Sequence, residues 1–397
     1  MKVKPADRTL SVQEYYFSQK LRQIDQMRKA GADVISLGIG SPDQAPSENT
    51  VKRLNEESIK PTSHGYQSYI GIPDLRKAFA GWYKKYFGVE LNPDNEILPL
   101  MGSKEGIMHI SMAFVNQGDE VLVPDPGYPT YSSVTNLVGG KIKYYELDEK
   151  NGWMPDLQAL ELLDLSKVKL MWVNYPHMPT GTQGSLKLFE NLVAFADAHS
   201  ILLCNDNPYS FILNRNYLSL LSVDGAKDVA LELNSLSKSH NMAGWRIGMV
   251  AGHSEYLKSI LRVKSNMDSG MFLPIQKAAV EALNNPIEWY EQINLVYEKR
   301  RKTVEEIMDI LGCTFDKNQV GLFVWGRISE SVANCEEYVE EILNKANVFI
   351  TPGFIFGKKG ERYIRISLCA GEDLLKEAKK RISSYADYVN QKSSNRK

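Results

Sequence analysis

The stretch Ser235-Leu-Ser-Lys-Ser-His-Asn-Met-Ala-Gly-Trp-Arg-Ile-Gly248 decides how the whole chain is interpreted. It places the amine of Lys238 just after hydroxyl side chains and eight residues before the guanidinium of Arg246. A lysine amine can form a Schiff base, while Ser235 and Arg246 can hold a phosphate dianion nearby. An aldehyde that carries a phosphate and binds a lysine describes pyridoxal 5'-phosphate. Taken alone, the stretch more often indicates an exposed lysine in a polar turn, so other residues have to support the cofactor.

The middle of the chain alternates between apolar, strand-like runs and longer amphipathic stretches. The runs expected to form strands are 96–101, 120–124, 169–174, 201–206, 230–235 and 247–251. Between two of them, apolar side chains recur at helical spacing in 186–196, which predicts a crossover helix. Repeated strand–helix–strand units predict an α/β fold with a mainly parallel sheet covered by helices on both faces. Ligands of such sheets bind beyond the carboxyl ends of the strands, where the polar segments of interest lie.

The C-terminal part of the chain has a different pattern. Residues 286–311 are expected to form a long helix, followed by the strands 321–328 and 363–367 and by helices that include 336–346 and 372–389. This pattern predicts a smaller α+β domain joined to the large one by the long helix. We therefore expect an N-terminal arm with part of the small domain at 1–44, a large cofactor-binding domain at 45–285 and a small C-terminal domain at 286–397.

Composition and charge exclude several classes of function. The chain has 397 residues and is 43% hydrophobic, as in an ordinary soluble globular protein. Its net charge of −1 gives no basic surplus for nucleic acid, and Lys299-Arg-Arg-Lys302 is expected to be a solvated helix face. No apolar run is long enough to cross a membrane. The cysteines are too far apart in sequence for a CxxC metal site or a disulfide framework, so we expect a cytoplasmic protein without a metal ion.

A glycine-rich segment offers a second phosphate site. Gly102-Ser-Lys-Glu-Gly106 follows a predicted strand and opens a helical run. Free backbone N–H groups at a helix start, together with the hydroxyl of Ser103, form a cradle for a phosphate. The same glycines also suit a tight connection without a ligand. Lys104 either reinforces the cradle or faces the substrate, and the sequence leaves both roles open.

Four more side chains have the chemistry that this cofactor needs. Asp206 ends an apolar run, where its carboxylate can pair with a protonated pyridine nitrogen or cap the next segment. Tyr209 can donate to the phenolic oxygen of the cofactor, and Tyr128, in a Pro/Gly-rich turn, can stack on a planar ring or simply pack. Arg365 is a lone cation at the centre of an apolar strand, so it needs a substrate carboxylate or an internal salt bridge.

Together these residues resemble the fold-type I, pyridoxal-phosphate-dependent aminotransferases of class I/II. The similarity extends from Ile39-Gly-Ser-Pro-Asp43 to Arg365-Ile-Ser367, and its most specific element is the spacing of Ser235, Lys238 and Arg246. The resemblance implies a seven-stranded type of sheet and a homodimer. It further implies that each matching residue of this chain has the role of its counterpart in the family.

By this resemblance, Lys238 forms the Schiff base, while Gly40 and Arg365 bind the α-carboxylate of the substrate. Tyr66, in His64-Gly-Tyr-Gln-Ser, matches a tyrosine that reaches the phosphate of a neighbouring subunit. The remaining residues implied in cofactor binding are Ser103, Lys104, Tyr128, Asp206, Tyr209, Ser235, Ser237 and Arg246.

The implied reaction is a ping-pong exchange of an amino group between an L-amino acid and a 2-oxo acid. Lys104 lies where some relatives use a lysine to meet an acidic side chain, and Leu98–Gly106 is similar to the block in proteins related to LL-diaminopimelate aminotransferase. We expect glutamate and 2-oxoglutarate as one pair, with aspartate or LL-diaminopimelate as the other amino acid. The same fold also hosts C–S β-lyases, which remain the alternative, and transcription regulators, for which the chain has little room before Ile35.

One position departs from the family pattern. Family members usually read Asn-Pro-Thr-Gly where this chain has Met178-Pro-Thr-Gly181. The asparagine normally donates to the phenolic oxygen of the cofactor, and a thioether cannot donate. Tyr209 then remains as the chief donor, unless Asn174, His177 or a water substitutes. The departure predicts a raised pKa for the imine of Lys238, because the phenolate is less stabilised.

Overall fold

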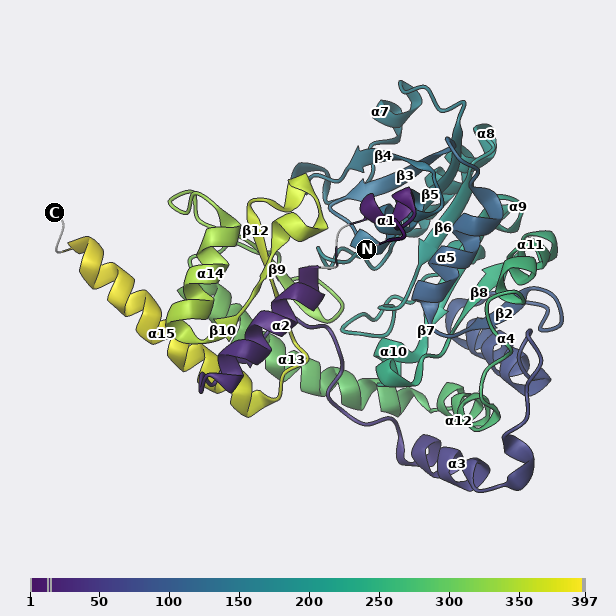
Figure 1. The fold of residues 1–397 in the computed structure, drawn as a ribbon, viewed down its shortest axis with the longest axis horizontal. Coiled ribbons are helices and arrows are strands. Elements are labelled where there is room, and N and C mark those ends of the chain that lie inside the picture. The colour runs from purple at the N-terminus through teal and green to yellow at the C-terminus, as the bar shows by residue number, and fades with distance from the viewer. Residues whose placement is uncertain (1, 13, 15, 395–397) are drawn as a thin grey trace.

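A computed structural model describes residues 2–12, 14 and 16–394 of the chain (Figure 1). Its main feature is a seven-stranded sheet with the strand order β2-β8-β7-β6-β5-β3-β4. The strands are β2 (Ile97–Leu100), β3 (Glu120–Asp125), β4 (Lys141–Glu146), β5 (Val168–Val173), β6 (Leu202–Asp206), β7 (Ala230–Ser235) and β8 (Gly248–Gly252). All pairs among β3 to β7 are parallel, while β8 is antiparallel to both β7 and β2. The expected mainly parallel sheet of a large α/β region is confirmed.

The six strands expected from the sequence all form within two residues of their predicted bounds, but β4 was not expected. Its sequence, Lys141-Ile-Lys-Tyr-Tyr-Glu146, lies at the edge of the sheet, and only Tyr145 in it is buried. An edge strand that faces solvent lacks the continuous apolar run of a central parallel strand, so its hydrophobic signal is weak.

Helices cover both faces of this sheet (Figure 1). In β5, Leu170 and Trp172 face one apolar core, while Met171 and Val173 face the other, because neighbouring side chains of a strand point to opposite faces. The first core includes side chains of α5, α6 and α11, and the second includes side chains of α4, α8 and α12. The helices of this region are α3 (Glu48–Ser58), α4 (Pro73–Phe87), α5 (Ser103–Phe114), α6 (Pro129–Leu137), α7 (Leu157–Glu161), α8 (Leu186–Ala198), α9 (Ala226–Val229), α10 (Leu236–Ser239), α11 (Ser254–Lys264) and α12 (Leu273–Leu283).

A second group of elements surrounds a smaller antiparallel sheet with the order β11-β12-β9. The long helix α13 extends from this group toward α12 (Figure 1). Near the other end of the chain, β1 pairs in parallel with β10, which places the segment before Gly38 beside residues from the C-terminal part. The domain boundaries at 44/45 and 285/286 stay predictions. The elements are α1 (Asp7–Leu10), α2 (Tyr16–Lys29), β1 (Ile35–Ser36), α13 (Ile287–Ile310), β9 (Phe323–Arg327), α14 (Cys335–Ala346), β10 (Val348–Phe349), β11 (Thr351–Pro352), the 3₁₀ turns η5 (Gly353–Phe356) and η6 (Lys358–Gly360), β12 (Tyr363–Ser367) and α15 (Glu372–Ser394).

Within the described ranges, none of the helices has the length and apolarity needed to span a membrane.

The crossover helix α8 allows a direct test of the core. The hydroxyl of Ser185 accepts the backbone N–H of Leu188 at 3.1 Å and caps the helix start. Leu192 is fully buried against the sheet, whereas Leu186 on the same helix is 48% exposed.

Truncation of Leu192 leaves a cavity, so we predict that Leu192→Ala lowers the free energy of unfolding by about 3 kcal/mol. Chemical denaturation measures this change, and Leu186→Ala, as the control, should change stability by less than about 1 kcal/mol. Equal effects of the two substitutions would contradict the assigned face of α8.

Candidate active site

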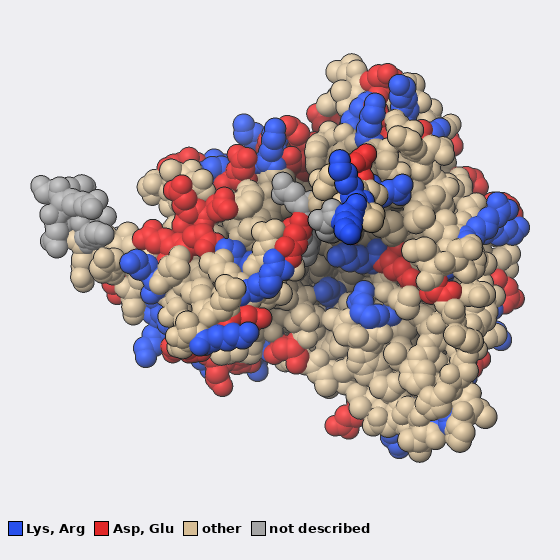
Figure 2. Space-filling view, in the orientation of Figure 1, with Lys and Arg blue, Asp and Glu red and all other residues tan. Residues whose placement is uncertain are grey.

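A cavity of about 550 Å³ lies between the carboxyl end of the large sheet and the small sheet. Figure 2 shows a hollow between the two parts of the molecule, with Lys and Arg side chains inside it. Every residue expected to bind cofactor or substrate lines this cavity except Tyr66. The lining residues expected from the sequence are Gly40, Ser103, Lys104, Tyr128, Asp206, Tyr209, Ser235, Ser237, Lys238, Arg246 and Arg365.

The first group of these side chains surrounds the start of α5. Gly102, with φ of +84°, turns the chain from β2 into this helix. A Cβ atom at Gly102 would lie 2.1 Å from Nη2 of Arg246, so only glycine allows the guanidinium to lie over the helix start. Arg246 also donates to the hydroxyl of Ser237 at 3.4 Å, and Ser235 donates to the same oxygen at 2.8 Å. Hydroxyls, a guanidinium and the free N–H groups of a twelve-residue helix therefore converge, which suits a phosphate dianion.

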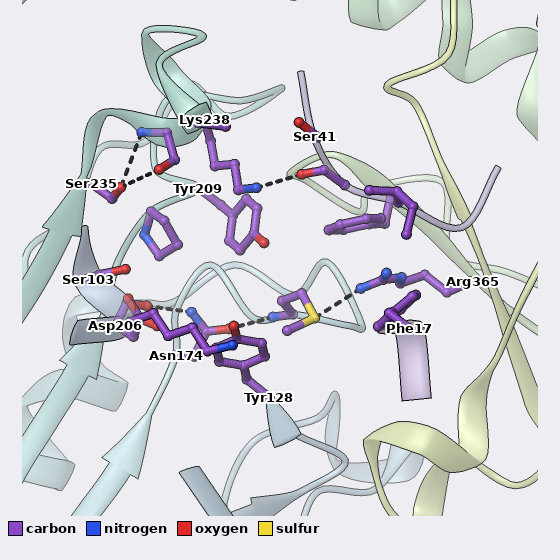
Figure 3. Close-up of a pocket in the computed structure, with 18 of the residues that line it drawn as sticks. Phe17, Ser41, Ser103, Tyr128, Asn174, Asp206, Tyr209, Ser235, Lys238 and Arg365 are labelled. Atoms are coloured by element: carbon purple, nitrogen blue, oxygen red, sulfur yellow. Dashed lines mark hydrogen bonds between the residues drawn. The ribbon is translucent and has the colours of Figure 1, made fainter. Parts of the chain in front are cut away.

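Lys238 follows β7 on the short helix α10 and extends into the cavity (Figure 3). Its Nζ donates to the carbonyl oxygen of Gly40 at 2.5 Å. Burial lowers the pKa of Lys238 below its ordinary value, and the positive charges of Arg365 and Arg246 lower it further. A lowered pKa increases the fraction of free amine, which is the form that attacks a carbonyl and accepts a proton.

Asp206 is the last residue of β6 and has one satisfied and one unsatisfied carboxylate oxygen. Oδ2 accepts the hydroxyl of Tyr131 at 3.1 Å, whereas Oδ1 is buried and has no hydrogen-bond partner. Burial raises the pKa of Asp206 to about 7, against the lowering effects of the Tyr131 and Ser103 hydroxyls and of Lys238. No helix in the described part of the chain begins directly after Asp206, so it does not act as a helix cap. The unsatisfied oxygen fits a ligand that brings a positively charged N–H group, as a protonated pyridine does.

Tyr131 is a site residue that the sequence reasoning missed. Its ring stacks on that of Trp172 with 5.1 Å between centroids, and its hydroxyl donates to Asp206. The motif Pro124-Asp-Pro-Gly-Tyr-Pro-Thr-Tyr131 contains two tyrosines, but only the three-dimensional fold assigns Tyr131 to the carboxylate.

Arg365 lies at the centre of β12 and faces the cavity from the side opposite Ser103 (Figure 3). Its Cζ atom is 3.7 Å from the ring centre of Phe323 and 4.6 Å from that of Phe356. Nη2 donates to the carbonyl oxygen of Gly38 at 3.0 Å. The rings of Phe323 and Phe356 and the carbonyl of Gly38 thus hold the guanidinium at the cavity wall, where its terminal nitrogens can bind a carboxylate.

The loop that contains Gly40 is fastened at several points. A Cβ atom at Gly40 would lie 2.2 Å from the ring of Phe323, so this position requires glycine. Farther along the loop, Asp43 receives two hydrogen bonds from Arg300 of α13, at 2.7 and 2.8 Å. The expectation that Lys299–Lys302 is a solvated helix face is therefore wrong for Arg300, which is buried. Its position on the inner face of α13 is the reason, because the helix turns that side chain toward the Gly40 loop.

Met178 contacts the arginine that faces the cavity. Its Sδ atom is 3.2 Å from Nη1 of Arg365. Of the possible replacements for the usual asparagine, Asn174 donates to the carbonyl oxygen of Asp206 and accepts the backbone N–H of Met178 at 2.8 Å. Nδ1 of His177 pairs with the hydroxyl of Thr180 at 2.8 Å. Tyr209 lines the cavity. Its role as the chief donor to the phenolic oxygen stays a prediction.

Lys104 and Tyr66 differ in how they lie relative to the cavity. Lys104 lines it, and burial, with the charge of Arg246, lowers the pKa of its amine. Tyr66 is 93% exposed and lies outside the cavity of its own chain. His64, two residues before Tyr66, has its ring 5.8 Å from that of Phe272, which is also exposed.

A group of acidic and imidazole side chains lies beside α5. Oxygen or nitrogen atoms of Glu105, His109 and Asp268 lie within 4.8 Å of one another. The amine of Lys264 is 2.7 Å from Asp268, and Glu105 accepts the backbone N–H of Met101 at 2.6 Å. The carboxylate of Asp268 therefore has an ion-pair partner in Lys264, and Glu105 is fastened to the backbone just before α5.

Known proteins resemble this chain over almost its whole length. A family model described as aminotransferase class I and II matches residues 32–382. The LL-diaminopimelate aminotransferase of Halothermothrix orenii is 40% identical over 96% of this chain and 98% of its own length.

Solved structures agree with this match. The substrate-bound BacF structure from Bacillus subtilis has a TM-score of 0.91 at 33% identity and covers 97% of this chain and 98% of that one. A probable N-succinyldiaminopimelate aminotransferase from Thermus thermophilus has a TM-score of 0.85 at 32% identity, with 92% and 99% covered. With a family model over most of the chain and a full-length relative at this identity, the chain belongs to the class I and II aminotransferases, which are pyridoxal-phosphate-dependent transaminases.

Proposed function

We propose that this aminotransferase acts on amino acids with a second carboxylate, with glutamate and 2-oxoglutarate as one substrate pair. The observation that carries the proposal is that one cavity contains two cationic side chains besides Lys238 and Arg246, namely Arg365 and Lys104. Arg365 is assigned to the α-carboxylate and Lys104 to the distal carboxylate. Burial and the charge of Arg246 lower the pKa of the Lys104 amine, so a distal carboxylate in the same cavity stabilises its charged form and favours a dicarboxylic substrate over a neutral one.

The other substrate is proposed to be LL-diaminopimelate. This molecule carries an amino group and a carboxylate at each of its two ends, so it also presents a distal carboxylate. Support comes from the relative in Halothermothrix orenii, which is named for this substrate, and from the Thermus thermophilus neighbour, which is named for its N-succinyl derivative. Aspartate is the further candidate from the sequence.

The residues around the cavity fit pyridoxal 5'-phosphate. Ser103, Ser235, Ser237 and Arg246 are proposed to hold the phosphate at the start of α5, while Tyr128 stacks on the ring and Tyr209 donates to its phenolic oxygen. Asp206, through its unsatisfied Oδ1, is proposed to keep the ring nitrogen protonated. When bound, the cofactor supplies an electron sink for the charge that develops as the α-carbon loses its proton.

Lys238 is proposed to hold the cofactor covalently and then to act as the general base. Its amine, when not bound to the cofactor, would take the proton from the α-carbon of the substrate and hold it as an ammonium for the return transfer. The lowered pKa supports this role, since an unprotonated amine is available nearer to neutral pH. Gly40 and Arg365 keep the α-carboxylate in place during this transfer.

Assembly and location also belong to the proposal. Tyr66 is proposed to reach the phosphate of a second copy of the chain in a homodimer, and its exposure outside its own cavity supports this. A cytoplasmic location is supported by the four cysteines, which are all free and buried.

The role of Lys238 is tested by Lys238→Ala. Removal of the amine takes away both the covalent attachment and the general base, so we predict a loss of turnover of at least about a thousandfold. Borohydride reduction of the holoenzyme followed by peptide mapping should label Lys238 and no other lysine. Lys187→Ala on the exposed face of α8 is the control and should retain full activity. Wild-type turnover in Lys238→Ala would contradict the role of Lys238 as the attachment point and general base.

The choice of substrate is tested by Lys104→Met, which keeps the length of the side chain and removes its charge. We predict that kcat/KM for glutamate falls about tenfold or more relative to kcat/KM for alanine, because the distal carboxylate loses its partner. Lys187→Met is the matched control. An unchanged ratio would reject the dicarboxylate assignment, and pyruvate release from cystathionine without a 2-oxo acid would favour the β-lyase instead.

Asp206 makes a pH-dependent prediction for the apoprotein. Its pKa is raised to about 7, from about 3.9 in an unfolded chain, so its contribution to stability is complete below about pH 4 and is lost as the pH rises through 7. Asp206→Asn does not titrate. The stability of Asp206→Asn relative to wild type should therefore rise by up to about 1.4 kcal/mol for each pH unit between about 4 and 7. Denaturant unfolding of both apoproteins at several pH values measures this, and a difference independent of pH would show that Asp206 ionises normally.

A further inference from the structure

A buried carboxylate connects the large sheet to the turn that carries one wall of the cavity. Asp125 is the last residue of β3 and is only 7% exposed. Its Oδ2 accepts the backbone N–H of Lys358 at 3.2 Å, and its Oδ1 accepts that of Lys359 at 3.0 Å. Two residues after Asp125, the N–H of Gly127 donates to the carbonyl oxygen of Phe356 at 2.8 Å. Three hydrogen bonds therefore join one short segment after β3 to the turn of η5 and η6.

The turn is shaped to receive this carboxylate. Gly357 lies between Phe356 and Lys358 and has φ of +134°, a conformation that side chains disfavour. A Cβ atom at Gly357 would lie 2.1 Å from Oδ1 of Asp125. The carboxylate can thus approach the backbone only because position 357 has no side chain.

Phe356 transmits the position of the turn to Arg365. Its ring lines the cavity, is buried, and lies 4.6 Å from the guanidinium carbon of Arg365. On its other side it packs edge-on against Trp325, with 5.9 Å between ring centres. Phe323 lies 3.7 Å from the same guanidinium carbon. A shift of the turn moves Phe356, and so changes one of the two rings closest to Arg365.

We propose that Asp125 is a positioning residue for the substrate α-carboxylate, which it serves by holding the 356–359 turn and so the ring of Phe356 against Arg365. This inference rests on the proposed function, in which Arg365 binds that carboxylate. Asp125 itself does not line the cavity. The same segment continues into Tyr128, which does line it, so the cofactor side and the carboxylate side of the cavity are fastened through neighbouring residues.

The test is Asp125→Asn in the holoenzyme. The amide has the same shape but turns a donor toward one of the two backbone N–H groups, so one of the two hydrogen bonds is lost. We expect KM for the amino acid and for the 2-oxo acid to rise about tenfold, with kcat changed less than about threefold and the visible absorption of the bound cofactor unchanged.

Glu146→Gln provides the matched control. Glu146 ends the neighbouring strand β4, and its carboxylate is 2.7 Å from the side-chain amine of Lys359, so it contacts the same turn. It is 69% exposed, and an exposed ion pair contributes little, so KM should stay at the wild-type value. Gly357→Ala is the second variant: its Cβ atom pushes the carboxylate away from the turn, and it should raise KM in the same way with kcat retained.

The outcomes distinguish failure of the positioning role of Asp125 from failure of the proposed function. An unchanged KM in both Asp125→Asn and Gly357→Ala overturns the positioning role, even if either variant is less stable. A fall in kcat or in cofactor binding without a rise in KM also overturns it. If Asp125→Asn does not fold, Gly357→Ala decides alone. Arg365→Gln tests the proposed role of Arg365 in binding the α-carboxylate. An unchanged KM in that variant rejects the proposed function itself. A raised KM in Arg365→Gln, with KM unchanged in the Asp125 and Gly357 variants, rejects only the positioning role.

Discussion

The site depends on the fact that the parallel strands of the large sheet end at one edge. Because β3, β6 and β7 are parallel, Asp125, Asp206 and Ser235 reach the same edge although they are far apart in sequence. The antiparallel strand β8 begins where β7 ends, so Arg246 lies there as well. Side chains gathered at this edge lose contact with water. Their burial raises the pKa of Asp206 to about 7 and lowers that of Lys238 below its ordinary value.

The substrate side of the cavity is built by a different set of elements. Arg365 comes from the small sheet, and the loop with Gly38 and Gly40 connects β1 to the large region. Backbone carbonyls of this loop accept hydrogen bonds from both Arg365 and Lys238, so one loop contacts the two most important cations of the site. The reacting groups therefore come from two parts of the molecule, and contacts that set how these parts meet affect binding as directly as the side chains in the cavity.

The sequence was sufficient for features that are local or strongly apolar. The central strands are buried on both faces, and α8 shows a clear helical period, so their hydrophobic patterns were sufficient to locate them. Residues at or just beyond a strand end, such as Asp206 and Ser103, could be placed because a parallel sheet brings strand ends together. The resemblance to a family supplied Gly40 and Tyr66, which no local pattern indicates.

Other features depend on contacts across the fold. The edge strand β4 has one buried residue, and β1 and β10 have two residues each, too few to show a period. Arg300 looked like part of a charged helix face because its partner, Asp43, is 257 positions away. Asp125 bonds to the turn that follows Phe356, and nothing in either segment alone indicates the other.

The pairing of β1 with β10 has a consequence for the order in which the protein matures on the ribosome. All strands of the large sheet lie before residue 253, so this sheet can assemble while later residues are still being made. The partner of Ile35 is Val348, which follows all of those strands in the sequence. The strand before the Gly38–Gly40 loop is therefore translated early, but it cannot pair with β10 until every strand of the large sheet has been made.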